Sequence, residues 1–265
     1  MGTSRQALYQ SEQRSEKRAE IALIVKSEVE KIRIEMPRLG TRKLYYLLAP
    51  KLKELGIKLG RDGLFSILRG FNLLIKKRKK YTQTTDSKHW LRKYPNLLKE
   101  QIIYKPEQVF VSDITYIKSK TRTHYLSLVT DAYSRKIMGY HLSDDMSAES
   151  VVKALKMAIK NKITAYPTIH HSDRGSQYCS AIYQQVLRKN KMNCSMTDGY
   201  DCYQNALAER INGILKDEFL YPLCCSEEVL KQLIKESIQI YNQRRPHLSL
   251  NMATPDFIHQ KDSET

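Results

Sequence analysis

Three acidic residues stand out because of their surroundings: Asp113, Asp173 and Glu209. Asp113 lies inside the apolar run 109–117, Asp173 directly follows the run 168–172, and Glu209 lies in a stretch with helical periodicity. Charged groups among apolar residues are costly unless they are paired or bind a metal, and hard divalent cations such as Mg²⁺ prefer oxygen ligands. In a strongly basic chain, these three carboxylates predict catalytic metal ligands for phosphoryl chemistry on a nucleic acid.

If the three carboxylates converge, they can hold two ions roughly 4 Å apart, one beside an attacking water or 3′-hydroxyl and one beside the departing oxygen. Other groups fit this role less well. Asp144 lies in an expected loop, and Asp131 at a strand end can instead form a salt bridge with Arg135. For His170 and His171 a structural role at a strand end is the better interpretation, although a histidine could also assist a metal.

The stretch that carries Glu209 can be placed on a helical wheel. At 100° per residue, Asn205, Asn212 and Lys216 fall within about 60° of Glu209, and the leucines and isoleucines fall on the opposite side. This polar stripe is either the solvated face of an amphipathic helix or a catalytic face. If it is catalytic, Lys216, Asn205 and Asn212 are candidate DNA contacts beside the acids.

Residues 106–265 have the pattern of a mixed α/β domain. Apolar runs predict strands, and periodic segments predict helices. The strands are expected at 108–118, 123–131, 136–142, 167–172 and 193–197, and the helices at 147–160, 180–190, 203–217 and 226–243. Strands in a meander, followed by strands that alternate with helices, indicate a mixed sheet with helices packed on it.

The first 105 residues are expected to be helical and then irregular. The segments are an N-terminal helix (1–36), a helix-turn-helix-like DNA-binding module (37–81) and a linker (82–105). Within the module, a helix from Thr41 should stop before Pro50, and another should start near Asp62. The candidate DNA contacts here are Arg61 and Arg69, off the apolar face, and the cationic run Lys76, Lys77, Arg78, Lys79 and Lys80.

Charge is unevenly placed along the chain. The formal net charge is +17, and residues 1–105 hold 25 Lys and Arg against 10 Asp and Glu. Such a basic segment favours polyanions and gives salt-dependent affinity for phosphate backbones. No stretch approaches the roughly 18 apolar residues of a membrane span, and five cysteines without metal-site spacing fit a reducing compartment. We therefore expect a cytoplasmic protein with no membrane partner.

Five short motifs in order resemble insertion-sequence transposases of the OrfB type, which carry a retroviral-integrase (DDE) catalytic core. The separation of 35 residues between Asp173 and Glu209 also matches that family, as does a lysine seven residues beyond the glutamate. The matching stretches are Asp113-Ile114-Thr115-Tyr116-Ile117, Ser134-Arg135-Lys136-Ile137, His171-Ser172-Asp173-Arg174-Gly175-Ser176-Gln177-Tyr178, Asn205-Ala206-Leu207-Ala208-Glu209 and Tyr241-Asn242-Gln243-Arg244-Arg245-Pro246-His247.

The resemblance implies an RNase H-like core over 106–265 that cleaves element ends and joins the freed 3′-hydroxyl to DNA. Asp113, Asp173 and Glu209 would bind Mg²⁺, with Mn²⁺ as an alternative. The implied partners are double-stranded DNA (terminal inverted repeats and target), further copies of the chain on that DNA, and an upstream-frame (OrfA-type) segment. The implied location is the bacterial cytoplasm, at the nucleoid. This chain would then be the downstream product alone or a shortened form.

Other interpretations remain open at this point. A catalytically inactive DNA-binding regulator of transposition would be expected to lack one of the acids, and a hydrolytic nuclease would be expected to lack a basic helical arm. A DNA-bridging protein would not need three acids at these separations. Arg244 and Arg245 either grip DNA or cap the last helix against the core.

Overall fold

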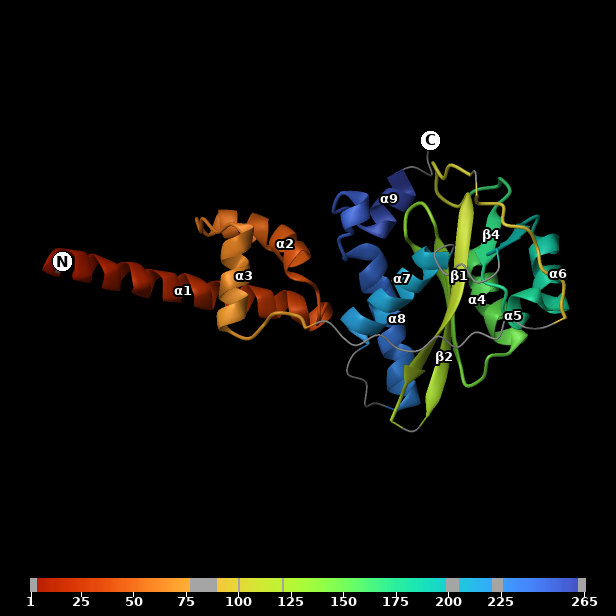
Figure 1. Ribbon diagram of the computed structural model, residues 1–265, viewed down its shortest axis with the longest axis horizontal. Coiled ribbons are helices and arrows are strands. Elements are labelled where there is room, and N and C mark those ends of the chain that lie inside the picture. Colours follow the sequence, from red (N-terminus) through yellow and green to blue (C-terminus); the bar gives the residue numbers. More distant parts are fainter. Residues whose placement is uncertain are drawn as a thin grey trace. The chain divides into compact units, whose positions relative to one another are not determined.

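The computed structural model describes residues 4–76, 90–99, 101–120, 122–198, 205–220 and 226–261. The chain divides into two compact units, Met1–Arg78 and Lys79–Thr265. Figure 1 draws the first unit in red to orange and the second in yellow to blue. None of the described helices is long and apolar enough to cross a membrane.

The described part of the first unit is a three-helix module. Its helices are α1 (Arg5–Glu35), α2 (Thr41–Glu54) and α3 (Arg61–Gly70). Only the second half of α1 is packed, and residues 4–20 are exposed on all sides. The apolar faces of the three helices meet through Val25, Val29, Leu44, Leu48, Leu52, Leu64 and Leu68, which are buried. The expected all-helical N-terminal part is therefore confirmed.

One expectation for this unit is wrong, because the helix from Thr41 does not stop before Pro50. α2 continues through Pro50 to Glu54. A proline removes one backbone donor and leaves the carbonyl of Tyr46 without its helical partner. Pro50 and Tyr46 are both exposed, so water can satisfy that carbonyl. The buried Leu48 and Leu52 meanwhile keep the helix on the core.

The second unit is built on one five-stranded mixed sheet with the order β3-β2-β1-β4-β5. β1 pairs antiparallel with β2, and β2 antiparallel with β3, whereas β1–β4 and β4–β5 are parallel pairs. This is the mixed sheet that the sequence predicts. The strands are β1 (Val109–Lys118), β2 (Thr123–Asp131), β3 (Ile137–Ser143), β4 (Ile169–Ser172) and β5 (Asn193–Met196).

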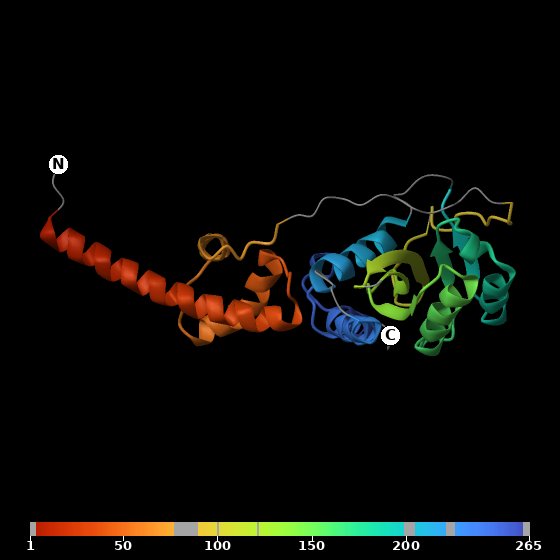
Figure 2. The same ribbon diagram turned by 90° about the horizontal axis from the view of Figure 1, so that it is seen from below.

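Helices cover both faces of this sheet, as Figures 1 and 2 show. One face carries α4 (Ala148–Lys160), α5 (Ser176–Cys179) and α6 (Ala181–Lys189), and the other carries α7 (Ala206–Ile214) and α8 (Glu227–Gln243). The short α5 is absent from the sequence prediction, and α7 continues into a π-helical turn, η2 (Leu215–Phe219).

The alternation of side chains along β1 explains why both faces are apolar. Successive strand residues point to opposite faces. Phe110 packs into the cluster that contains residues of α4 and α6, whereas Val109 and Val111 pack with Ala208 of α7. The strand therefore reads as one continuous apolar run in the sequence.

The segment before β1 belongs largely to the second unit. Residues 90–105 lie within the expected linker, but Leu91 and Tyr94 pack against one core cluster, and Leu98 and Ile103 against the other. The backbone N–H of Leu97 also donates to Ser195 Oγ at 2.9 Å. The described residues between 90 and 105 of the expected linker therefore pack on the second unit. Residues 82–89 lie outside the described residues.

The C-terminal helix α9 (Pro255–Lys261) is held by a buried polar cluster. His259 is fully buried, with Nε2 3.3 Å from Glu107 Oε1 and Nδ1 3.5 Å from Asp131 Oδ2. Ser134 donates its backbone N–H to the same oxygen of Asp131 at 2.9 Å. Among the described residues, Asp131 therefore pairs with His259. It does not form the expected salt bridge with Arg135.

Gly139 marks the closest approach of β3 to α4. A Cβ on Gly139 would clash with the carbonyl oxygen of Ala154 and lie 2.6 Å from the backbone nitrogen of Ala158. We expect Gly139→Ala to lower the free energy of unfolding by roughly 3 kcal/mol or more, because backbone atoms cannot move aside. Chemical denaturation monitored by circular dichroism measures this change.

Gly213→Ala is the matched control, since nothing lies within 4 Å of the added Cβ on α7. It should leave stability within about 1 kcal/mol of the parent, on the stabilising side. If Gly139→Ala and Gly213→Ala were equally stable, β3 could not approach α4 as closely at Gly139 as the structure shows.

Candidate active site

β1 presents Asp113 to the face of the sheet that α7 covers. Asp113 points to the same face of β1 as Val109 and Val111, because alternate residues of a strand share a face. Val109 and Val111 pack on α7. Ser112 points to the opposite face, where its Oγ lies 2.8 Å from His170 Nε2. The apolar run around Asp113 therefore buries both faces of the strand and leaves a single carboxylate on the α7 side.

Asp173 follows β4 directly beside Asp113. β4 is parallel to β1, with Ser112 paired to Ser172, so the next residue of each strand lies on adjacent strands about 4.8 Å apart. The turn after β4 fixes this carboxylate, because the Gly175 N–H donates to Asp173 Oδ1 at 3.0 Å. A Cβ on Gly175 would lie 3.1 Å from the same oxygen, so glycine keeps the turn open.

α7 brings Glu209 to this pair and is tied to β1 by two asparagines. Asn205 donates to the carbonyl of Ser112 at 3.2 Å, and Asn212 donates to Asp113 Oδ2 at 2.7 Å. Both side chains are 4 % exposed, whereas Glu209 is exposed. The two asparagines of the polar stripe therefore face β1, whereas Glu209 of the same stripe remains exposed.

The three carboxylates are electrostatically coupled. Burial raises the pKa of Asp113 to about 7, with contributions from the negative charges of Asp173 and Glu209, although the hydrogen bond from Asn212 acts in the opposite direction. Burial and the charge of Asp173 also raise the pKa of Glu209. A divalent cation relieves this mutual repulsion.

The donor set suits a hard cation. It consists of carboxylate oxygens, and Asn212 Oδ1 is a further buried oxygen without a hydrogen-bond partner among the described residues. The three carboxylates do not all bring an oxygen within 4.8 Å of one another.

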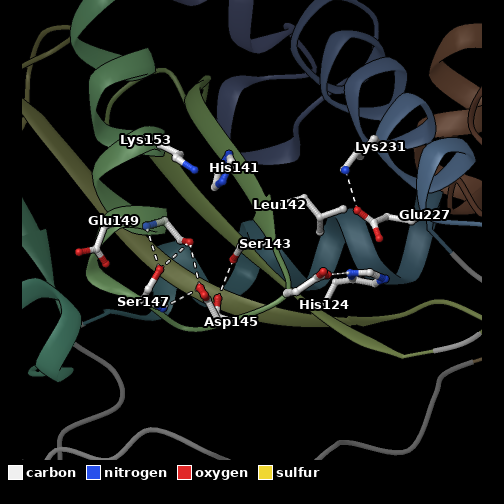
Figure 3. A pocket seen from close by; sticks show the side chains of 12 residues that line it. His124, His141, Leu142, Ser143, Asp145, Ser147, Glu149, Lys153, Glu227 and Lys231 are labelled. Atoms are coloured by element: carbon white, nitrogen blue, oxygen red, sulfur yellow. Dashed lines mark hydrogen bonds and ion pairs between the residues drawn. The ribbon is translucent and has the colours of Figure 1, made fainter.

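A second group of potential ligands lies elsewhere and already has protein partners. His124, Asp144 and Glu227 have ligand atoms within 4.8 Å of one another, in a pocket of about 450 Å³ beside β3 and the first turns of α4 and α8 (Figure 3). His124 Nδ1 lies 2.7 Å from Asp144, which also pairs with Arg122 at 2.7 Å, and Lys231 pairs with Glu227 at 2.6 Å. These contacts account for the carboxylates without an ion.

The two histidines before Asp173 have structural surroundings. His170 Nε2 lies 2.8 Å from Ser112 Oγ and 2.8 Å from the Tyr183 hydroxyl, on the face away from Asp113. Burial lowers the pKa of His170 to about 3, so its ring stays neutral. His171 Nδ1 lies 2.8 Å from Ser195 Oγ. The interpretation of both residues as structural agrees with these contacts.

The predicted DNA-contacting cations differ in where the structure places them. Arg61, Arg69, Lys76 and Arg244 are exposed, and Lys216 is half-buried on η2. Lys77, Arg78, Lys79 and Lys80 lie outside the described residues.

Three predicted DNA contacts, Asn205, Asn212 and Arg245, are buried and have protein partners in this structure. The two asparagines are buried against β1, where they hold Ser112 and Asp113. Arg245 is 1 % exposed, and its guanidinium pairs with Glu218 at 2.7 Å. The sequence does not identify Glu218 as the partner of Arg245, because the only local signal is a pair of arginines after a helix.

Comparisons with known proteins agree with this geometry. Two sequence models of the family "Integrase core domain" match residues 103–202 and 190–255. The insertion element IS600 uncharacterized 31 kDa protein of Shigella sonnei is 35 % identical over 87 % of this chain and 87 % of its own. Transposase InsF for insertion sequence IS3fB of Escherichia coli (strain K12) is 32 % identical over 76 % of this chain and 70 % of its own.

A chain of the simian T-cell lymphotropic virus intasome, solved with PP2A regulatory subunit B56 gamma, superposes with a TM-score of 0.53. It is 17 % identical and covers 83 % of this chain and 74 % of its own. At that identity the match shows the fold alone, which is the RNase H-like fold that the sequence predicts.

The raised pKa of Asp113 predicts that Asp113→Asn stabilises the metal-free protein. A carboxyl whose pKa is raised on folding contributes stability below its unfolded pKa, near 4, and loses that contribution as the pH rises through about 7. Each pKa unit is worth about 1.4 kcal/mol, so the gain above pH 7 should be about 1–4 kcal/mol. Thermal melts in chelator at pH 5 and pH 8 measure it.

The gain should be large at pH 8 and small at pH 5. Asp145→Asn serves as the control, because Asp145 is exposed and bonds to Ser147 near the start of α4. A pH-independent effect of Asp113→Asn would contradict the position of this half-buried carboxylate beside Asp173.

Proposed function

Because the chain belongs to the insertion-sequence transposases with an integrase core domain, we propose that Asp113, Asp173 and Glu209 are the catalytic residues with which it cuts and joins DNA. The chain is a DNA transposase of the integrase type. The observation that carries the residue assignment is the convergence of three carboxylates on the α7 face of the sheet, with the pKa of Asp113 and of Glu209 raised in part by the charge of Asp173.

We propose Mg²⁺, with Mn²⁺ as an alternative, as the cation that these carboxylates hold. When bound, such ions supply positive charge that activates an attacking oxygen and stabilises the departing one. In the reaction, water would attack a phosphodiester at the element end and leave a free 3′-hydroxyl. That hydroxyl would then attack a phosphodiester of the target and displace its 3′ oxygen.

The protein's own residues hold the site in place. Asn212 orients Asp113, and the backbone N–H of Gly175 orients Asp173. Glu209 is exposed at the rim of the site, where a phosphate would approach. Lys216 lies two helical turns further along, and we propose that it contacts a DNA phosphate beside the acids.

We further propose that the first unit grips the terminal inverted repeats through Arg61, Arg69 and the run from Lys76 onward. The exposure of Arg61 and Arg69 on α3 supports this role. Several copies of the chain would assemble on the element ends and target DNA. An upstream-frame (OrfA-type) segment would add a further DNA-binding partner, and the setting would be the nucleoid in the bacterial cytoplasm.

The catalytic assignment predicts a separation of cleavage from binding. Asp113→Asn, Asp173→Asn and Glu209→Gln should each lower strand cleavage by roughly a thousandfold or more, because each removes a charge that the metal-assisted transition state needs. Binding to labelled element-end DNA should stay within a few-fold of the parent. Cleavage and binding are measured on the same DNA with Mg²⁺ or Mn²⁺.

Glu149→Gln is the control, since Glu149 is exposed in the first turn of α4. It should cleave at the parental rate. Normal cleavage by any of the three acid variants would remove that residue from the catalytic set.

The DNA role of α3 predicts a change in salt dependence. Replacement of Arg61 and Arg69 by Gln should weaken binding to element ends and reduce the slope of log affinity against log salt by about 1–2. Replacement of Arg14 and Arg18 by Gln removes the same charge from the exposed half of α1. Equal losses from the two pairs would show that the charge acts non-specifically.

A further inference from the structure

The helix that carries Glu209 is held by its apolar face and by a small number of side-chain hydrogen bonds. The described residues 205–220 stand between 199–204 and 221–225, which lie outside the described residues. Within 205–220 the apolar face is buried through Ala208, Ile211, Leu215 and Phe219. The side chain of Glu209 makes no hydrogen bond among the described residues, so the place of its carboxylate depends on the position of α7.

Arg245 holds the far end of this helix. Its side chain is 2 % exposed, and the guanidinium makes two parallel bonds to Glu218, from Nε at 2.8 Å and from Nη2 at 2.7 Å. Nη1 donates to His247 Nε2 at 3.0 Å and to the carbonyl of Pro246 at 3.4 Å. Because arginine has no acceptor and stays protonated, His247 must accept with a neutral ring nitrogen.

The position of Glu218 gives this pair a specific consequence. Glu218 lies in the π-helical turn η2, which also contains Lys216. A π turn holds an extra residue and changes the direction of the side chains that follow, and such turns are frequent at functional sites. A bidentate arginine fixes both the distance and the plane of the carboxylate. It therefore fixes how far α7–η2 can rotate or slide.

We propose that Arg245 is a positioning residue for Glu209, acting through Glu218 and the helix α7–η2. This inference rests on the proposed catalytic role of Glu209. Asn205 and Asn212 attach the helix to β1, and Arg245 attaches its other end to the segment after α8. Glu209 and Glu218 are nine residues apart, or about 13 Å along the axis. We call the Arg245–Glu218 ion pair the clamp. A small shift of this clamp would move the Glu209 carboxylate.

Repulsion within the site gives the clamp its function. Two carboxylates that share a site repel each other, which favours movement of α7 away from the sheet when no cation is bound. The Arg245 clamp opposes this movement and keeps Glu209 within reach of the cation. The alternative is that the pair serves stability alone, as many buried ion pairs do, or does not even increase it.

Hydrogen–deuterium exchange of the full chain separates these two interpretations. Arg245→Lys keeps the charge but loses the fork, and Glu218→Gln keeps the shape but loses the charge. Each should speed exchange of peptides in 205–220 by about tenfold relative to peptides of α4 and β1. Each should also raise the Mn²⁺ concentration for half-maximal cleavage of element-end DNA several-fold, with DNA affinity unchanged.

Asp256→Asn is the matched control, because it removes a part-buried ion pair, Lys136–Asp256 at 3.0 Å, that does not involve α7. It should leave exchange of 205–220 and the Mn²⁺ requirement unchanged. Loss of stability in the two clamp variants with parental Mn²⁺ requirement and uniform exchange would overturn the proposal. Normal cleavage by Glu209→Gln would instead overturn the proposed catalytic role of Glu209. The two experiments therefore distinguish a failure of that role from a failure of the positioning role of Arg245.

Discussion

Repulsion between like charges is the constraint on which the catalytic unit depends. Asp113, Asp173 and Glu209 come from two strands and a helix, and burial raises the pKa of Asp113 to about 7. No local property of the sequence favours bringing these three carboxylates together, so neighbouring residues of the fold must hold them in place. The Gly175 N–H does this for one carboxylate and Asn212 for another. The third carboxylate is carried by a helix that must itself be attached at several points.

The sheet separates the face that carries the acids from the face that packs on α4 and α6. On the α4 and α6 face, Ser112 Oγ and the Tyr183 hydroxyl each lie 2.8 Å from His170 Nε2, and Gly139 lets α4 approach β3 closely. On the α7 face, buried oxygens remain without partners and carboxylates crowd together. Because alternate residues of a strand serve opposite faces, β1 carries both environments. The packing of β1 on α4 and α6 therefore helps to position Asp113 on the opposite face.

The sequence predicts the strands, their order of appearance and the three acids, because apolar periodicity and motif spacing are local properties. It does not predict which polar groups become buried. The helical wheel places Asn212 correctly beside Glu209, but it cannot tell whether that stripe faces water or the carboxylates of a distant strand. The burial of Arg245 could not be predicted either, because its partner Glu218 is 27 residues away in the sequence. Pro50 misleads for the opposite reason, because tertiary burial of Leu48 and Leu52 outweighs the lost backbone bond.

Buried ionic groups in this unit lie where separate segments must be held on the sheet. Arg245–Glu218 holds the end of the helix α7–η2, and His259 with Glu107 and Asp131 holds α9. A hydrophobic contact could supply similar stability, but it tolerates sliding, whereas a hydrogen-bonded ion pair loses much of its energy when its geometry changes. A site that crowds three negative charges needs that geometric strictness. The polar burial around the acids is therefore better understood as a means of fixing position than as a source of net stability.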